Sequence, residues 1–205
     1  MRLNRNTILL ALKGYYFKLK FFLIGIAVAG LEEFITQGVL KDRPFGWIVP
    51  TLIAFGPFLG VMRLAGVLYD RRLAPARATA LYYLTAGATG LALEWSMMGL
   101  APWKNPSPLQ IVFQSGMFSF WGTVAMAPRF LLDNRPAVGI VRRQFRWALI
   151  TGFAFVYILT FISPKEARFP VAIGAVLLVF LSLNVFYFAY VRAFRSIPRS
   201  VDGTN

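Results

Sequence analysis

The chain has 205 residues, of which 58% are hydrophobic, with a mean hydropathy of +0.61 and a formal net charge of +14. Soluble domains are usually about 45–50% apolar, so this composition indicates a membrane-embedded protein. The sequence contains no Cys and no His, which excludes disulfides, thiolate nucleophiles, Cys or His metal ligands and imidazole acid–base chemistry. We therefore expect neither a metal nor another cofactor, and carboxyl groups are the main titratable groups near neutral pH.

The positive charge lies in short clusters of Lys and Arg between apolar stretches and does not follow one helical face. No nucleic-acid-binding motif accompanies these clusters, so we expect no nucleic-acid partner. Clusters of this kind are typical of the loops that orient a membrane protein.

Residues 1–18 combine four basic side chains with apolar ones, which predicts a cytoplasmic, interfacial segment that leads into the first span. A cleavable signal peptide is the alternative, because the triplet Ala27-Val28-Ala29 follows a cationic start. Against cleavage, the cationic region is long and apolar character resumes at Phe34.

Six stretches are long enough to cross about 30 Å of hydrocarbon, which takes about 20 helical residues. Short loops marked by Pro, Gly and charge separate them. We predict an all-α integral membrane protein with one six-helix transmembrane domain, residues 19–191, and a basic cytoplasmic tail, residues 192–205. The predicted spans lie near 19–40, 46–69, 79–101, 109–132, 145–163 and 170–191.

The distribution of charge predicts the orientation of these spans. With the N-terminus in the cytoplasm, sixteen basic residues lie inside and five outside, and Arg63 falls within the second span. This bias in short loops predicts that both termini are cytoplasmic. Trp47 and Trp103 near outer ends, and Trp147 near an inner end, fit aromatic belts at the membrane surfaces. We expect a multi-pass protein of a bacterial cytoplasmic membrane.

Four ionisable residues lie within the apolar spans: Glu32, Glu33, Arg63 and Glu94. Such residues are costly at bilayer depth and therefore mark candidate functional positions. Glu33 and Glu94 are each expected about 10 Å below the outer end of their spans. Arg63 belongs to the opposite leaflet, where its side chain is expected to extend to the cytoplasmic head groups.

Small residues at helical spacing predict which way these acids face. Gly25 and Ala29 precede Glu33 at intervals of four, and Ala86 and Gly90 precede Glu94 in the same way. Because small residues let helices approach closely, both glutamates are expected to point into the bundle.

We predict a pocket in the outer half of the membrane with Glu33 and Glu94 as catalytic acids. Burial favours the protonated form of a carboxyl group, which suits a general acid. The expected substrate-binding residues are Glu32, Trp95, Gln110, Gln114, Phe118, Trp121 and Asn184. The alternative is that these polar side chains only hydrogen-bond to one another and hold the helices together.

Three functions fit these features. We favour an integral-membrane enzyme that uses carboxylic acids to cyclise or isomerise a lipid-soluble, isoprenoid-like substrate, since aromatic faces stabilise carbocations. The Glu32-Glu33 pair within a span resembles an acidic pair of small membrane carotenoid and terpene cyclases; the likeness covers this pair and the general architecture, and we assign no family from it.

The second function is a small proton- or cation-coupled transporter or channel, because acids within spans often mark such pathways. The third is a non-catalytic subunit or assembly factor, whose small-residue faces dock partner helices. Beyond the bilayer and a lipid-soluble small molecule, the expected partners are a second copy of the chain or a larger membrane complex.

Overall fold

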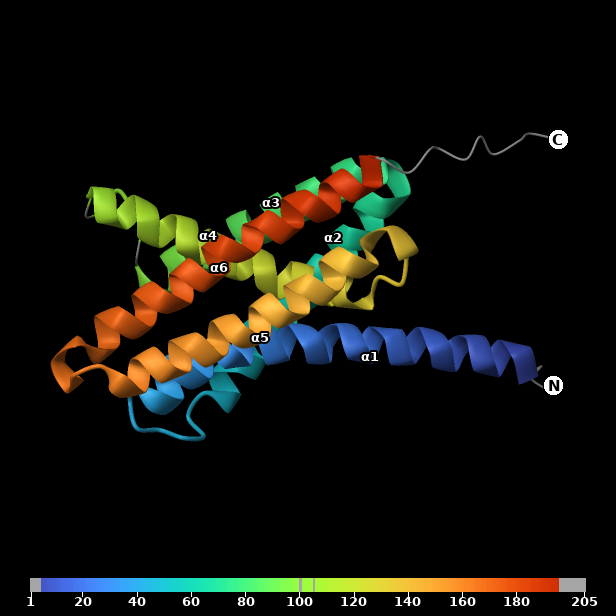
Figure 1. Ribbon diagram of the computed structural model, residues 1–205. Helices are drawn as coiled ribbons and strands as arrows, with labels where there is room; N and C mark the ends of the chain where they lie inside the picture. Colours follow the sequence, from blue (N-terminus) through green and yellow to red (C-terminus); the bar gives the residue numbers. More distant parts are fainter. Residues whose placement is uncertain (1–4, 100, 105, 196–205) are drawn as a thin grey trace.

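The computed structural model describes residues 5–99, 101–104 and 106–195, and all regular structure within them is helical (Figure 1). This confirms the prediction of an all-α fold. The elements are α1 (Arg5–Glu33), the π-helix η1 (Phe34–Val39), α2 (Ile48–Arg72), α3 (Pro75–Met98), α4 (Pro108–Leu132), the 3-10 helix η2 (Pro136–Val138), α5 (Gly139–Ile162) and α6 (Lys165–Arg195).

Each predicted span overlaps one α-helix, with differences at the ends. Helix α1 begins at Arg5, so no break separates the predicted interfacial segment from the first span, and residues 1–4 lie outside the described part. Helix α6 continues to Arg195, past the predicted start of the tail. Backbone hydrogen bonding can continue past the point where the sequence becomes polar, so a helix can be longer than its apolar segment.

Three segments within the described residues are long and apolar enough to cross a membrane: Ile48–Arg72, Pro136–Ile162 and Lys165–Ala193. Helices α3 and α4, with 24 and 25 residues, also exceed the length of about 20 residues that a span requires.

Local sequence signals explain where helices α3 and α4 begin and end. Pro75 lies in the first turn of α3, where its missing N–H costs no hydrogen bond. Gly99 ends α3 in the left-handed conformation, with φ of 67°. The Ser107 hydroxyl caps α4 by accepting a hydrogen bond from the backbone N–H of Gln110 at 3.2 Å, and Pro108 follows it.

Helix α4 is the centre of the molecule. It packs on α1, α3 and α6, and every residue from 119 to 128 is buried. A helix in this position faces protein on most sides, so it can carry polar side chains without exposing them at the surface of the molecule. Its polar residues are therefore the ones that meet other helices.

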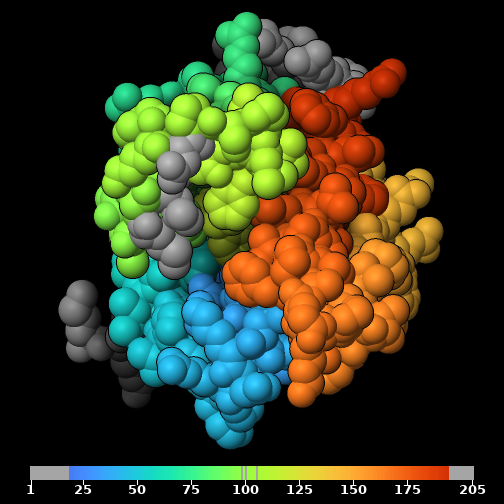
Figure 2. Space-filling model, turned by 90° about the vertical axis from the view of Figure 1, so that its left-hand side faces the viewer, coloured from blue at the N-terminus to red at the C-terminus, as the bar shows by residue number. Residues whose placement is uncertain are grey.

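Successive helices run in alternating directions (Figure 1). The beginning of α1, the α2–α3 turn, the α4–α5 connection and the end of α6 gather at one end of the molecule. Figure 2 shows the other end, where the α1–α2 loop (light blue), the α3–α4 turn (green) and the α5–α6 turn (orange) lie together. These two ends correspond to the sides that the sequence assigns to the cytoplasm and to the outside.

Candidate functional site

The carboxyl groups of Glu32, Glu33 and Glu94 lie within electrostatic range of one another near the second of these ends. Glu32 and Glu33 are the last two residues of α1, and Glu94 lies in the last turns of α3. Glu32 interacts electrostatically with both other carboxyl groups, and Glu33 interacts with Glu94. All three side chains are partly buried. The structure thus brings the two predicted catalytic acids together with their predicted neighbour.

Glu94 is oriented by Trp121 of the central helix. The indole Nε1 of Trp121 donates a hydrogen bond to Oε1 of Glu94 at 3.3 Å. The indole is 3% exposed and lies between two rings of α2, stacked on Phe55 and edge-on to Phe58, with centroid distances of 4.7 Å in both cases. Gly90 gives it room, since a Cβ atom there would lie 1.9 Å from Cγ of Trp121.

Glu33 lies at the buried end of a short polar chain. Its Oε2 atom is buried and has no hydrogen-bond partner in the described structure. Gln37, one turn further along η1, hydrogen-bonds to the Glu33 side chain, and the exposed Lys41 donates to Oε1 of Gln37 at 2.8 Å. Single-turn π-helices are often found at functional sites, and this one carries the groups that lead from the surface to Glu33.

A second set of predicted residues lines a cavity between α3, α4 and α6. Its volume is about 760 Å³, within the range of about 300–1,000 Å³ usual for small-molecule sites. Gln114, Phe118 and Asn184 belong to its wall, which is mainly apolar. Along α3 the wall extends from Thr79 to Leu91, or about 18 Å at the helical rise.

Polar groups lie at two levels of this cavity, one at its middle and one nearer the α3–α4 turn. The Tyr83 hydroxyl donates to Oδ1 of Asn184, whose Nδ2 donates to the Ser119 hydroxyl at 2.9 Å. Nearer the α3–α4 turn, Nε1 of Trp95 donates a hydrogen bond to Oε1 of Gln114 at 2.8 Å. The cavity therefore offers a few fixed polar groups in an apolar surface.

The structure divides the predicted pocket into two parts. Glu33, Glu94 and Trp121 do not line the cavity that contains Gln114 and Asn184. Gln114 and Trp121 share a face of α4, but a helix face meets different neighbours along its length: Trp121 packs on the rings of α2 as well as on α3, whereas Gln114 hydrogen-bonds to α3 and faces the cavity. Two of the predicted substrate-binding residues lie outside this cavity. Glu32 belongs to the acid cluster, and the partly buried Gln110 lies in the first turn of α4, where its backbone binds Ser107.

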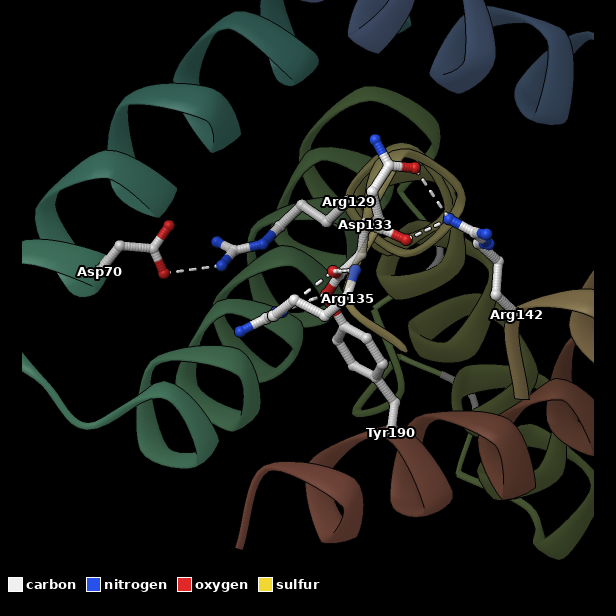
Figure 3. A network of polar contacts seen from close by, with 7 residues as sticks. Asp70, Arg129, Asp133, Arg135, Arg142 and Tyr190 are labelled. Carbon is white, nitrogen blue, oxygen red and sulfur yellow. Dashed lines mark hydrogen bonds and ion pairs between the residues drawn. The ribbon is translucent and has the colours of Figure 1, made fainter. Parts of the chain in front are cut away.

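A third polar site, at the opposite end of the molecule, was missed by the sequence analysis. Arg129 of α4 forms an ion pair of 2.7 Å with Asp70 of α2 (Figure 3). The Arg129 guanidinium also lies 4.5 Å from the centroid of the Tyr82 ring. Beside it, Asp133 accepts hydrogen bonds from Arg135 and, at 2.7 Å, from the Tyr190 hydroxyl.

The sequence contained one signal for this site, since Arg129 and Asp133 stand four apart where a span ends and Asp70 ends another span on the same side. As a basic residue at the end of a predicted span, Arg129 indicated only the orientation of the protein, and the sequence pattern predicted no role for Asp70 or Asp133. Asp133 follows the predicted span near 109–132. Burial opposes its ionisation, but the hydrogen bonds from Arg135 and Tyr190 outweigh burial and hold the pKa of Asp133 below its ordinary value.

No protein-family model, curated protein or solved structure matches the chain. Functional inference therefore rests on the three sites. Within the described residues, no group of three or more Asp or Glu side chains is arranged to hold a metal ion.

Proposed function

We propose that this chain is a multi-pass membrane enzyme that acts on a lipid-soluble, isoprenoid-like substrate by carboxylic-acid general acid and base catalysis. The proposal includes six spans with both termini in the cytoplasm. The observation that carries it is the convergence of Glu32, Glu33 and Glu94 from two helices, next to the indole of Trp121 and the ring of Phe55.

The cluster suits proton transfer because its groups differ in their surroundings. These three side chains interact electrostatically, and negative charges on all of them would repel one another, so the cluster is more stable with fewer than three negative charges. Trp121 hydrogen-bonds to Glu94 and Gln37 to Glu33, but the Oε2 atom of Glu33 is buried without a partner in the described structure. We therefore assign the proton of the acid to Oε2 of Glu33 and the role of base to Glu94.

These assignments give a balanced reaction. The protonated carboxyl group of Glu33 transfers its proton to a carbon of a substrate double bond, and the resulting carbocation is attacked by a second double bond, which forms a carbon–carbon bond. The carboxylate of Glu94 then removes a proton from the carbon next to the new cation, which restores a double bond, and transfer of that proton from Glu94 to Glu33 returns both groups to their starting states. No electrons are gained or lost, so the product is an isomer of the substrate. Aromatic faces such as that of Trp121 stabilise the cation.

The cavity between α3, α4 and α6 supports an apolar substrate. It is elongated along the helices, and its wall is mainly apolar, as an isoprenoid chain requires. Leu91, the last α3 residue of the cavity wall, precedes Glu94 by three positions, so the wall and the acid cluster are about one helical turn apart on α3.

Proton- or cation-coupled transport is the second candidate, and one observation favours it. Polar side chains continue along the interface of α4 and α6, from Ser119 and Asn184 to Asp133 and Tyr190. A docking subunit has less support, because the small-residue faces around Ala29 and Ala86, both 0% exposed, already pack inside this chain.

Comparative lipid analysis tests the enzyme proposal. Total lipids from cells that express the wild type, the Glu33→Gln/Glu94→Gln double variant or the control Glu166→Gln are compared by mass spectrometry at matched protein levels. Glu166 is an exposed acid in the first turn of α6, so its variant controls for the loss of a carboxylate. We expect a lipid isomer, resolved by chromatography at unchanged mass, in wild-type and control extracts and its loss in the double variant.

Identical lipid extracts from all three strains would contradict the proposal that the protein is an enzyme. In that case, proton uptake is measured in vesicles that contain either the purified wild type or the double variant. Uptake with the wild type and none with the double variant would indicate transport. A thermal melt of each purified variant in detergent shows that loss of function is not loss of folding.

A further inference from the structure

A small pocket lined by three arginines lies at the end of the molecule that the sequence assigns to the cytoplasm. Its volume is about 270 Å³. Arg63 of α2, Arg129 of α4 and Arg135 reach it, together with Asp70 and Asp133. It is distinct from the acid cluster and from the cavity between α3, α4 and α6.

The guanidinium groups of this pocket are held in place before any ligand binds. Arg129 is fixed by its ion pair with Asp70 and by the ring of Tyr82. It also lies against the backbone of α2, since a Cβ atom on Gly66 would be 2.9 Å from its Nη1 atom. The guanidinium of Arg63 lies 5.2 Å from the centroid of the Phe21 ring, a cation–π contact that holds it at the wall of the pocket.

The charge of the lining favours an anion. Three guanidinium groups and two carboxylates leave one positive charge, and the carboxylates are already engaged, Asp70 by Arg129 and Asp133 by Arg135 and Tyr190. Arg142 adds a further positive charge nearby, where it donates hydrogen bonds to the backbone oxygen of Asp133 and, at 3.0 Å, to Asn134 (Figure 3).

The size and the other walls of the pocket select the kind of anion. At about 270 Å³ the pocket is smaller than the range of about 300–1,000 Å³ for whole small molecules, so it suits one charged group. Arginine binds phosphate oxygens through two parallel hydrogen bonds. Phe21, Val67 and Leu132 give the pocket apolar walls next to its charges, as the boundary between a head group and an acyl chain requires.

We propose that this pocket binds the phosphate of an anionic phospholipid head group in the cytoplasmic leaflet. Basic pockets between helices on this side of a membrane are suited to anionic head groups. The bound lipid contacts α2 through Arg63 and α4 through Arg129, and it thereby links two helices that are separate in the sequence.

Native mass spectrometry of the full chain in a neutral detergent tests this proposal. Delipidated protein is titrated with phosphatidylglycerol or with phosphatidylcholine, and the fraction of protein with bound lipid is measured. The variants are Arg63→Gln, which removes one pocket charge, and Arg77→Gln, which removes the same charge from the exposed first turn of α3 at the same end of the molecule.

We expect wild type and Arg77→Gln to retain phosphatidylglycerol in preference to phosphatidylcholine. Arg63→Gln should bind phosphatidylglycerol about fivefold less tightly, since a basic residue near a membrane surface contributes about 1 kcal/mol to binding of anionic lipid. Equal binding by Arg63→Gln and Arg77→Gln would overturn the proposal.

Two further measurements keep the test decisive. Val67 lines the pocket and is 40% exposed, so Val67→Phe fills the pocket without changing its charge and should also weaken phosphatidylglycerol binding if Arg63→Gln fails to fold. Inorganic phosphate is then added to the wild-type complex. Displacement of the lipid at equal concentration would assign the pocket to a soluble phosphate compound and overturn the lipid proposal; persistence of the complex supports it.

Discussion

The indole Nε1 of Trp121 and Oε1 of Glu94 are 3.3 Å apart and join two helices through residues that are 27 positions apart in the chain. This hydrogen bond orients a carboxyl group beside an aromatic face, in a place where two further carboxyl groups gather. It is the contact on which the proposed chemistry depends most directly.

Replacing Trp121 with Phe tests the contact itself. Trp121→Phe keeps an aromatic ring between Phe55 and Phe58 but removes the N–H donor, and a hydrogen bond to a charged group contributes about 1.5–3 kcal/mol. We expect at least about tenfold less of the lipid product, measured by mass spectrometry of extracts. Trp103→Phe is the control, because Trp103 is 67% exposed. Equal product from both variants would show that the indole does not assist the acid.

Gly90 is predicted to be intolerant of any side chain. In Gly90→Ala the new Cβ atom would lie 1.9 Å from Cγ of Trp121, so the indole must move away from Glu94. Overpacking of this kind costs about 1–3 kcal/mol, and we expect a lower melting temperature in detergent. Gly60→Ala on α2 is the matched control, because no atom lies within 4 Å of a Cβ atom there. A Gly90→Ala protein as stable as Gly60→Ala would contradict the packing described above.

Asn184 is expected to couple α6 to α3 and α4. Asn184→Leu removes the hydrogen bonds to Tyr83 and Ser119, and such bonds between membrane helices contribute about 0.6 kcal/mol on average. We expect a loss of about 1 kcal/mol, measured by unfolding in mixed micelles. The double variant with Tyr83→Phe should lose less than the sum of the two single losses. Strict additivity would show that the two side chains act independently.

Asp133 gives the fold a dependence on pH. Its pKa in the folded protein lies below the ordinary value of 3.8, so the stability that it contributes is complete above that value and is lost as the pH falls through the folded pKa. We expect the melting temperature of the wild type to fall between about pH 4 and about pH 2 by more than that of Asp133→Asn. Glu166→Gln, which removes an exposed carboxyl group, should follow the wild type. Parallel curves for wild type and Asp133→Asn would contradict the role of Asp133.

The approximate bounds of the helices and some close contacts between helices were predictable from the sequence. The apolar stretch near 109–132 became Pro108–Leu132, because the Ser-Pro start and the apolar run are both encoded within a few residues. The spacing of Gly90 and Glu94 predicted a close approach of helices, and Gly90 does contact Trp121. Features of this kind depend on residues within one or two turns of a helix.

The sequence by itself determined the helical class, the positions of the helices and which residues are too polar for an apolar segment. Only the tertiary structure decided which of those residues meet. Glu33 and Glu94 come together, Gln114 and Asn184 line a separate cavity, and Arg129 finds Asp70 59 residues away. Hydropathy and helical periodicity report the face and depth of a side chain within its own helix, whereas the neighbour it meets depends on how packing orders and inclines the helices.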